Sequence, residues 1–95
     1  MNVSRQTISS DRISFGIKTT PMGVGYEDIA RVWAEADRVP EIESAWLWDH
    51  LMPLHGDPTT PLLEGWTLLS ALAARTERLR LGLMVSNNLN RAPGL

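Results

Sequence analysis

The chain has 95 residues, enough for one small domain. Nine Lys and Arg stand against eleven Asp and Glu, so the net charge of −2 gives no general attraction to nucleic acid or to an anionic membrane. Cysteine is absent, which excludes a disulfide framework, a thiolate metal site and a cysteine nucleophile. No apolar run approaches the roughly 20 residues of a membrane span, and residues 1–12 lack a signal-peptide core. We therefore expect a cytoplasmic globular protein without nucleic-acid or membrane partners.

The first half of the chain divides into a tail, a strand and a helix. Residues 1–12 are polar and aperiodic, and we predict a disordered tail before a single domain over 13–95. Alternating apolar residues from Ile13 to Ile17 predict a strand, and Pro and Gly over 20–25 predict a loop. A helix is predicted over 26–38, with Pro40 stopping it. Its apolar stripe comprises Ile29, Val32, Trp33, Ala36 and Val39.

The second half predicts two more strands and one more helix. Residues 44–48 are short and almost wholly apolar, which is typical of a strand buried on both faces. A loop over 51–60 follows. Thr60 as N-cap and Pro61 at the first helical position then predict a helix starting near residue 61. Its stripe would comprise Leu62, Trp66, Leu69, Ala73 and Thr76, so Trp66, like Trp33, is predicted to be core. Alternation over 79–85 predicts the third strand.

This alternation of strands and helices predicts an α/β fold with a parallel sheet. Polar residues follow each predicted strand, as Lys18-Thr19-Thr20, Asp49-His50 and Ser86-Asn87-Asn88. Ligands of parallel α/β folds collect at the carboxyl ends of the strands, so these residues are candidates for a site. The alternative is that strand ends are polar because they meet water.

His50 is the most informative candidate, because histidine exchanges protons near neutral pH, and Asp49 could orient it or bind a ligand. The alternative is an ordinary surface-loop pair. A metal site built from Asp49, His50, His55 and Asp57 would match no recognised ligand spacing, and we predict none. Phosphate loops are excluded as well, because no Walker sequence is present and Asp28 stands where a dinucleotide fingerprint needs its third glycine.

Several longer motifs resemble the bacterial luciferase-like family, and within it the branch that uses the deazaflavin coenzyme F-420. The resemblance extends over about residues 13–95. The strongest motif is the second-strand signature, AWLWDHLMP. The others are FGI in the first strand, PLLEGWTLLSALAART in the second helix, RLRLGLMV in the third strand and NRAP in the turn after it.

The resemblance implies a (β/α)8 barrel that transfers a hydride between coenzyme F-420 and a small organic substrate, in an enzyme that is a homo-oligomer at full length. Asp49 and His50 match the family's cofactor-facing pair, and His50 would be the catalytic proton acceptor or a cofactor contact. Met84, Val85, Ser86 and Asn87 match the strand-three segment that backs the cofactor, with a non-prolyl cis bond at Met84–Val85 or, as the next alternative, at Val85–Ser86.

The alternative cofactor is FMN, as in a luciferase-like monooxygenase. The substrate stays open, although members that oxidise a sugar phosphate carry Glu and Trp where Met22 and Leu54 stand here.

A (β/α)8 barrel takes about 250 residues, so this sequence of 95 would supply two βα units and a third strand. We expect it to be the N-terminal part of a barrel that is incomplete in this chain. The isolated chain would then be unstable or aggregation-prone, because its outer strands are unpaired edges, and it would be catalytically inactive. The alternative class is a non-catalytic remnant or interaction fragment that retains the motif.

Overall fold

The computed structural model describes residues 12–92 and 94, and it has the predicted order of elements. The elements are β1 (Phe15–Lys18), α1 (Tyr26–Arg38), β2 (Ile42–Leu47), α2 (Gly65–Ala73) and β3 (Arg80–Leu83). The predicted tail lies outside the described residues except for Arg12, whose guanidinium pairs with the Glu43 carboxylate. No helix in the described part of the chain is long and apolar enough to cross a membrane.

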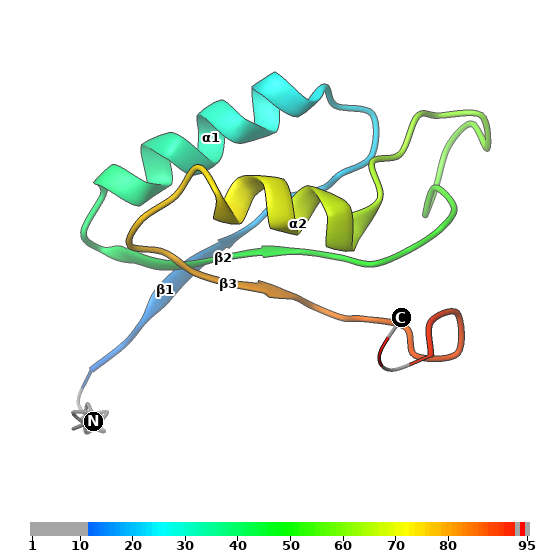
Figure 1. The fold of residues 1–95 in the computed structure, drawn as a ribbon. Coiled ribbons are helices and arrows are strands. Elements are labelled where there is room, and N and C mark those ends of the chain that lie inside the picture. Colours follow the sequence, from blue (N-terminus) through cyan, green and yellow to red (C-terminus); the bar gives the residue numbers. More distant parts are fainter. Residues whose placement is uncertain (1–11, 93, 95) are drawn as a thin grey trace.

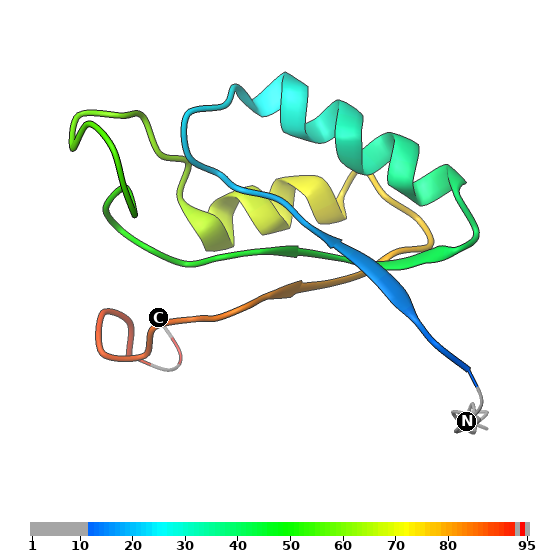
Figure 2. The ribbon, with the colours of Figure 1, turned by 180° about the vertical axis from the view of Figure 1, so that it is seen from behind.

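The three strands form one parallel sheet in the order β1-β2-β3. Both helices lie on the same face of this sheet, as the two opposite views show (Figures 1 and 2). In the register, Ala45 at the centre pairs with Ile17 on one side and Leu81 on the other. These three side chains join the core beneath the helices. Because the strands are parallel, their carboxyl ends reach one edge of the sheet.

Helix α1 has the predicted bounds, but its buried stripe is shifted. Trp33 is fully buried, and its indole N–H donates to Thr19 Oγ1 at 2.9 Å, which fixes the direction of the inward face. Ala30, which was not predicted, is buried on that face. Val32 and Val39 were predicted to be buried and are instead 48% and 38% exposed. The helix therefore buries a narrower stripe than its apolar residues suggest.

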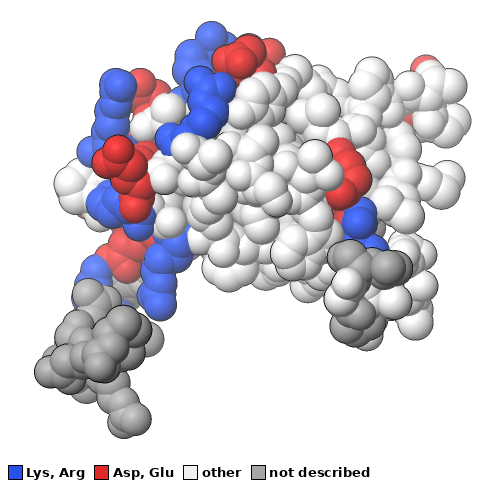
Figure 3. Space-filling view, in the orientation of Figure 1, with Lys and Arg blue, Asp and Glu red and all other residues white. Residues whose placement is uncertain are grey.

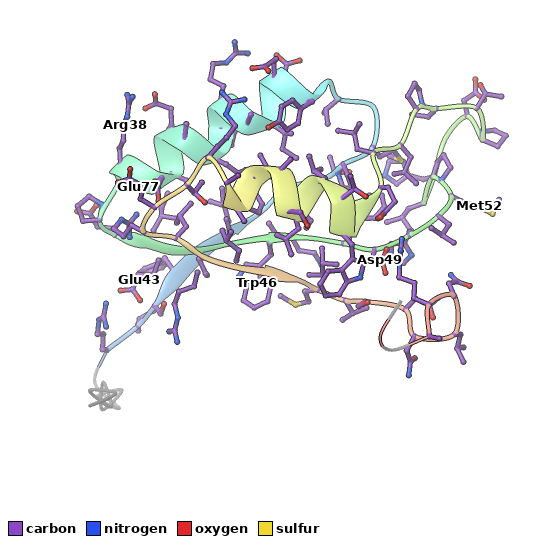
Figure 4. All side chains as sticks on the ribbon, viewed as in Figure 1. Arg38, Glu43, Trp46, Asp49, Met52 and Glu77 are labelled. Carbon is purple, nitrogen blue, oxygen red and sulfur yellow. The ribbon has the colours of Figure 1, made fainter. Side chains whose placement is uncertain are left out.

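Strand β2 is not buried on both faces, which corrects the sequence prediction. Ala45 and Leu47 are fully buried under the helices, whereas Trp46 is only half-buried on the opposite face (Figure 4). The indole of Trp46 lies across the neighbouring strands. A Cβ on Gly82 would come within 2.5 Å of its ring, and one on Gly16 within 3.3 Å of its Nε1. Glycine is required at both positions if the indole is to keep this place.

Helix α2 begins four residues later than predicted. Residues 61–63 are extended, because Leu63 N–H donates to Pro21 O at 3.0 Å and Gly23 N–H donates to Pro61 O at 2.8 Å. This antiparallel contact prevents helix formation at Pro61. The N-cap is Glu64, whose carboxylate accepts the backbone N–H of Trp66 at 2.7 Å.

The later start of α2 also changes its buried face. Gly65, Leu68 and Leu72 face the core, whereas Trp66 is 45% exposed. The prediction that Trp66 belongs to the core is therefore wrong. Gly65 sets this phase because its backbone lies directly against the end of β2, where a Cβ would meet Trp48 O at 2.9 Å.

Where α1 stops and β2 begins, charged side chains join several segments of the chain. Figure 3 shows acidic and basic groups gathered over α1 and at the end where α1 stops and β2 begins. Asp37 accepts the backbone N–H groups of Glu77, Arg78 and Leu79 at 2.9–3.0 Å. The Arg78 guanidinium donates to the carbonyls of Ala36, Val39 and Ile42 at 2.7–3.0 Å. These bonds join the end of α1, the start of β2 and the segment before β3.

Candidate functional site

The carboxyl end of β2 leads directly into a buried acid. Asp49 is 2% exposed and lies between the start of α2 and the segment after β3 (Figure 4). Its backbone N–H donates to Val85 O at 3.2 Å, so the ends of β2 and β3 stay together beyond the regular sheet. Of the three polar strand ends, those of β2 and β3 therefore meet.

The partner of this acid is Arg91, far along the chain. Arg91 Nε donates to Asp49 Oδ2 at 2.8 Å and to Oδ1 at 3.1 Å. Arg91 Nη2 donates to Glu64 Oε2 at 3.0 Å. One guanidinium thus joins the end of β2, the cap of α2 and the segment after β3.

Three further hydrogen bonds close this network into a ring. Ser86 Oγ donates to Asp49 Oδ2 at 3.2 Å and accepts the indole N–H of Trp66, also at 3.2 Å. The backbone N–H of Trp66 returns to Glu64 Oε2 at 2.7 Å. We call these five residues the carboxylate ring: Asp49, Glu64, Trp66, Ser86 and Arg91.

The carboxylate ring keeps Asp49 ionised. Burial by itself raises the pKa of this carboxyl group, since it disfavours charge. The hydrogen bond and the positive charge of Arg91 oppose burial, with smaller help from the Asn87 backbone N–H and the Ser86 hydroxyl. Together they hold the pKa of Asp49 below its ordinary value.

His50 follows immediately and is more accessible than Asp49. Its side chain is half-buried, and its ring lies 5.0 Å from that of Trp48, at a tilt of 59°. Just after the neighbouring strand β3, Met84 and Val85 are 42% and 63% exposed, and the peptide bond between them is cis, at one of the two positions that the resemblance implies. A histidine and two apolar side chains are therefore accessible at the ends of two adjacent strands.

The remaining polar residues at the strand ends serve local structure. Asn87 Oδ1 accepts the backbone N–H of Leu89 at 3.0 Å, which stabilises the turn after β3. Thr19 holds the Trp33 indole, and Thr20 Oγ1 accepts the N–H of Met22 at 3.1 Å. The structure thus brings Asp49 and Ser86 into direct contact, and it does not bring the end of β1 into that network.

A cavity of about 710 Å³ opens beside the carboxylate ring. Its lining includes Glu64, Trp66, Ser86 and Arg91. Ser86 and Asn88, both candidates from the polar end of the third strand, line it, whereas His50 is not among the lining residues. Within residues 12–92 and 94, no three His, Cys, Asp or Glu side chains gather in a group able to hold a metal ion.

Comparison with known proteins now decides the family. The family model described as luciferase-like monooxygenase matches residues 9–95. The chain belongs to the luciferase-like family. No curated protein and no solved structure gives a significant match. Luciferase-like proteins are oxidoreductases, monooxygenases among them, and use flavin-type cofactors.

The sequence prediction for this luciferase-like chain missed two charged members of the site, Glu64 and Arg91. Arg91 was noticed only within the turn motif NRAP. A buried Asp needs a cation or several hydrogen-bond donors close by. A buried strand that ends in Asp49 therefore indicates that a basic residue elsewhere in the chain pairs with it. Nothing in local sequence indicates Glu64 as the cap, because Thr60-Pro61 is the stronger start signal.

Proposed function

We propose that this chain carries the cofactor-facing half-site of an F-420-dependent oxidoreductase of the luciferase-like family. The observation that carries the proposal is the meeting of β2 and β3 at Asp49 and Ser86, with His50 accessible beside them. The preference for F-420 rests on the resemblance of AWLWDHLMP to the second-strand signature of that branch.

The accessible side chains at this edge suit a planar, largely apolar ring. Met84 and Val85 offer apolar surface, and the half-buried His50 offers a polar group at the end of the adjacent strand. These residues, with Ser86 and Asn87, would hold the cofactor. When bound, a deazaflavin supplies hydride transfer and reacts poorly with oxygen.

His50 has a defined role in this proposal. An imidazole nitrogen of His50 would take the hydroxyl proton of an alcohol substrate as the carbinol carbon gives up its hydride, and in the reverse direction it would return that proton. The bound cofactor would supply the hydride acceptor. The half-buried position of His50 against Trp48 suits such a group, because it limits rotation of the ring yet leaves it accessible.

The arrangement of the sheet supports a larger barrel around this site. Both helices cover one face, and Trp46 lies over Gly16 and Gly82 on the other. In a (β/α)8 barrel the helices lie outside and the opposite face of the sheet fills the interior. We propose that the three strands are part of such a barrel.

A second candidate is an FMN-dependent monooxygenase, because the matching family model is described by that activity. Fluorescence titration of the full-length protein with F-420 and with FMN tests both. We expect F-420 to bind and FMN to bind at least tenfold more weakly. Tight binding of FMN without F-420 would establish the second candidate instead, and binding of neither would favour the non-catalytic remnant.

The role of His50 is tested by His50→Asn, which keeps a polar side chain but removes the proton acceptor. We expect kcat to fall by about 10²–10⁴-fold, the range typical of general acid–base catalysis. The substitution His55→Asn is the matched control, because His55 is exposed in the loop after β2. Equal activity of His50→Asn and the wild type would exclude His50 as the base.

A further inference from the structure

We propose that Arg91 is a positioning residue for the oxidoreductase site, and that Asp49 acts through the carboxylate ring instead of contacting the cofactor. This inference rests on the proposed function. It gives Asp49 a different role from the cofactor-facing one that the family resemblance implies.

The first step concerns the oxygens of Asp49. Oδ1 accepts from Arg91 Nε, and Oδ2 accepts from the same nitrogen and from Ser86 Oγ. The side chain is 1% exposed, so a ligand has no route to it without breaking these bonds. A carboxylate whose oxygens are bonded in this way holds its own backbone in place and is poorly suited to bind a second molecule.

The second step concerns the rigidity of the surroundings. Arg91 reaches Asp49 and Glu64 through separate nitrogens, so the guanidinium spans two carboxylates. Gly65 allows the start of α2 to lie against Asp49, since a Cβ there would come within 3.4 Å of both Asp49 Cα and Oδ1. Helix α2, β2 and the segment after β3 therefore meet at one point, and at Gly65 the backbones pack too closely to admit a Cβ.

The third step links this point to His50. Asp49 precedes His50, its N–H holds Val85 O, and the residue before it, Trp48, is 8% exposed and contacts the His50 ring. Loss of Arg91 would leave an unpaired buried carboxylate, and the chain would relax by moving Asp49 toward water. His50 and Val85 would move with it, and a shift of about 1 Å at a catalytic group costs about 100-fold in rate.

The experiment compares Arg91→Met and Arg91→Lys with Arg78→Met in the full-length protein. Arg78 is the matched control because it also joins several segments, at the opposite end of the sheet. Without cofactor, NMR measures the contact between the Trp48 and His50 rings and the indole N–H signal of Trp66. With cofactor and substrate, kcat and KM are corrected for the folded fraction.

We expect Arg91→Met to lose the ring contact, to shift the Trp66 signal and to lower kcat at least tenfold, with cofactor affinity changed less than threefold. Arg91→Lys keeps the charge, and should recover part of kcat. If Arg91→Met does not fold, the same NMR signals are measured in Arg91→Lys, and they decide whether Arg91 positions His50. Arg78→Met should lower stability while leaving the ring contact and kcat intact.

Several results would overturn the inference. The first is an unchanged ring contact in the Arg91 variants, and the second is a loss of cofactor affinity with kcat unchanged, which would make Arg91 a direct contact. An equal effect of Arg78→Met would show a purely structural role. Failure of the wild type to bind F-420 or FMN would instead reject the proposed function, while the NMR comparison without cofactor still tests the positioning of His50.

Discussion

At the scale of single residues, Asp49 shows how a buried charge is tolerated in a small α/β chain. A carboxylate removed from water loses hydration, and only close donors can compensate. Here the compensation comes from Arg91 and Ser86, which both follow β3. Arg91 remains 26% exposed, so the pair is partly solvated and its net contribution is smaller than that of a fully buried pair.

The lowered pKa of Asp49 predicts how stability depends on pH. A carboxyl group whose folded-state pKa is depressed contributes stability above its unfolded pKa of about 3.9, and that contribution is lost as the pH falls through the folded value. We expect Asp49→Asn to lower the free energy of unfolding of the full-length protein at pH 7 by about 1–3 kcal/mol. The variant should lose less stability than the wild type between pH 5 and pH 2. Urea unfolding across this range measures both effects.

The control for this experiment is Asp28→Asn, which removes an exposed carboxylate paired with Arg31 one helical turn away. Such a pair contributes roughly 0–1 kcal/mol, so its pH profile should follow that of the wild type. Parallel pH profiles for Asp49→Asn and the wild type would contradict the assignment of Asp49 as an ionised, paired group.

Sequence reasoning located Asp49, His50 and Ser86 at strand ends because order along the chain fixes which residues follow a strand. It did not find the contact between Asp49 and Arg91, since 42 positions separate them and only the folded chain brings them together. Periodicity describes neighbours along one element. Pairing across elements depends on where loops return, which neither composition nor spacing encodes.

At the scale of elements, the two helices differ in what sets their limits. The start and end of α1 were predictable, because loop-forming glycines precede Tyr26 and Pro40 follows Arg38. The start of α2 was not, because the strong local signal at Thr60-Pro61 is overridden by the contact of residues 61–63 with the loop at Pro21–Gly23. A local cap signal determines a helix start only where the backbone has no competing partner.

Gly65 is the residue at which the start of α2 packs against the end of β2. A Cβ there would lie 2.9 Å from Trp48 O, a backbone atom that cannot move aside cheaply. We expect Gly65→Ala to destabilise the full-length protein by about 1–3 kcal/mol, as overpacking does, although alanine has the higher helix propensity. Urea unfolding measures the change.

The matched control for Gly65→Ala is Gly25→Ala at the N-cap of α1, where a Cβ would meet only Asp28 Oδ2 at 3.5 Å and φ is −82°. Its cost should stay below about 1 kcal/mol, because the cap has no side-chain bond to lose and only the preference for glycine over alanine at an N-cap is lost. Equal stability of the Gly65→Ala variant and the wild type would show that α2 can move away from β2, which would also weaken the argument for a rigid carboxylate ring.

At the scale of the whole molecule, the covered and the open faces of the sheet explain the remaining differences between the sequence prediction and the structure. A strand as apolar as residues 44–48 predicts burial on both faces, yet Ala45 and Leu47 on the helix face are fully buried while Trp46 on the opposite face is only half-buried. The strand pattern therefore agrees with the proposed barrel better than with a sheet of three strands.

The 95 residues alone should for that reason be a poor folding unit. β1 and β3 are edge strands with backbone groups free to pair with other chains. Among the described residues, both helices lie on one face of the sheet and no helix covers the other. We expect the isolated chain to aggregate or to unfold without a cooperative transition, and to show no oxidoreductase activity. Thermal melting followed by circular dichroism, with the mass in solution from analytical ultracentrifugation, tests this. A cooperative transition of a monomer would contradict it, because such a chain would not need further strands to cover Trp46.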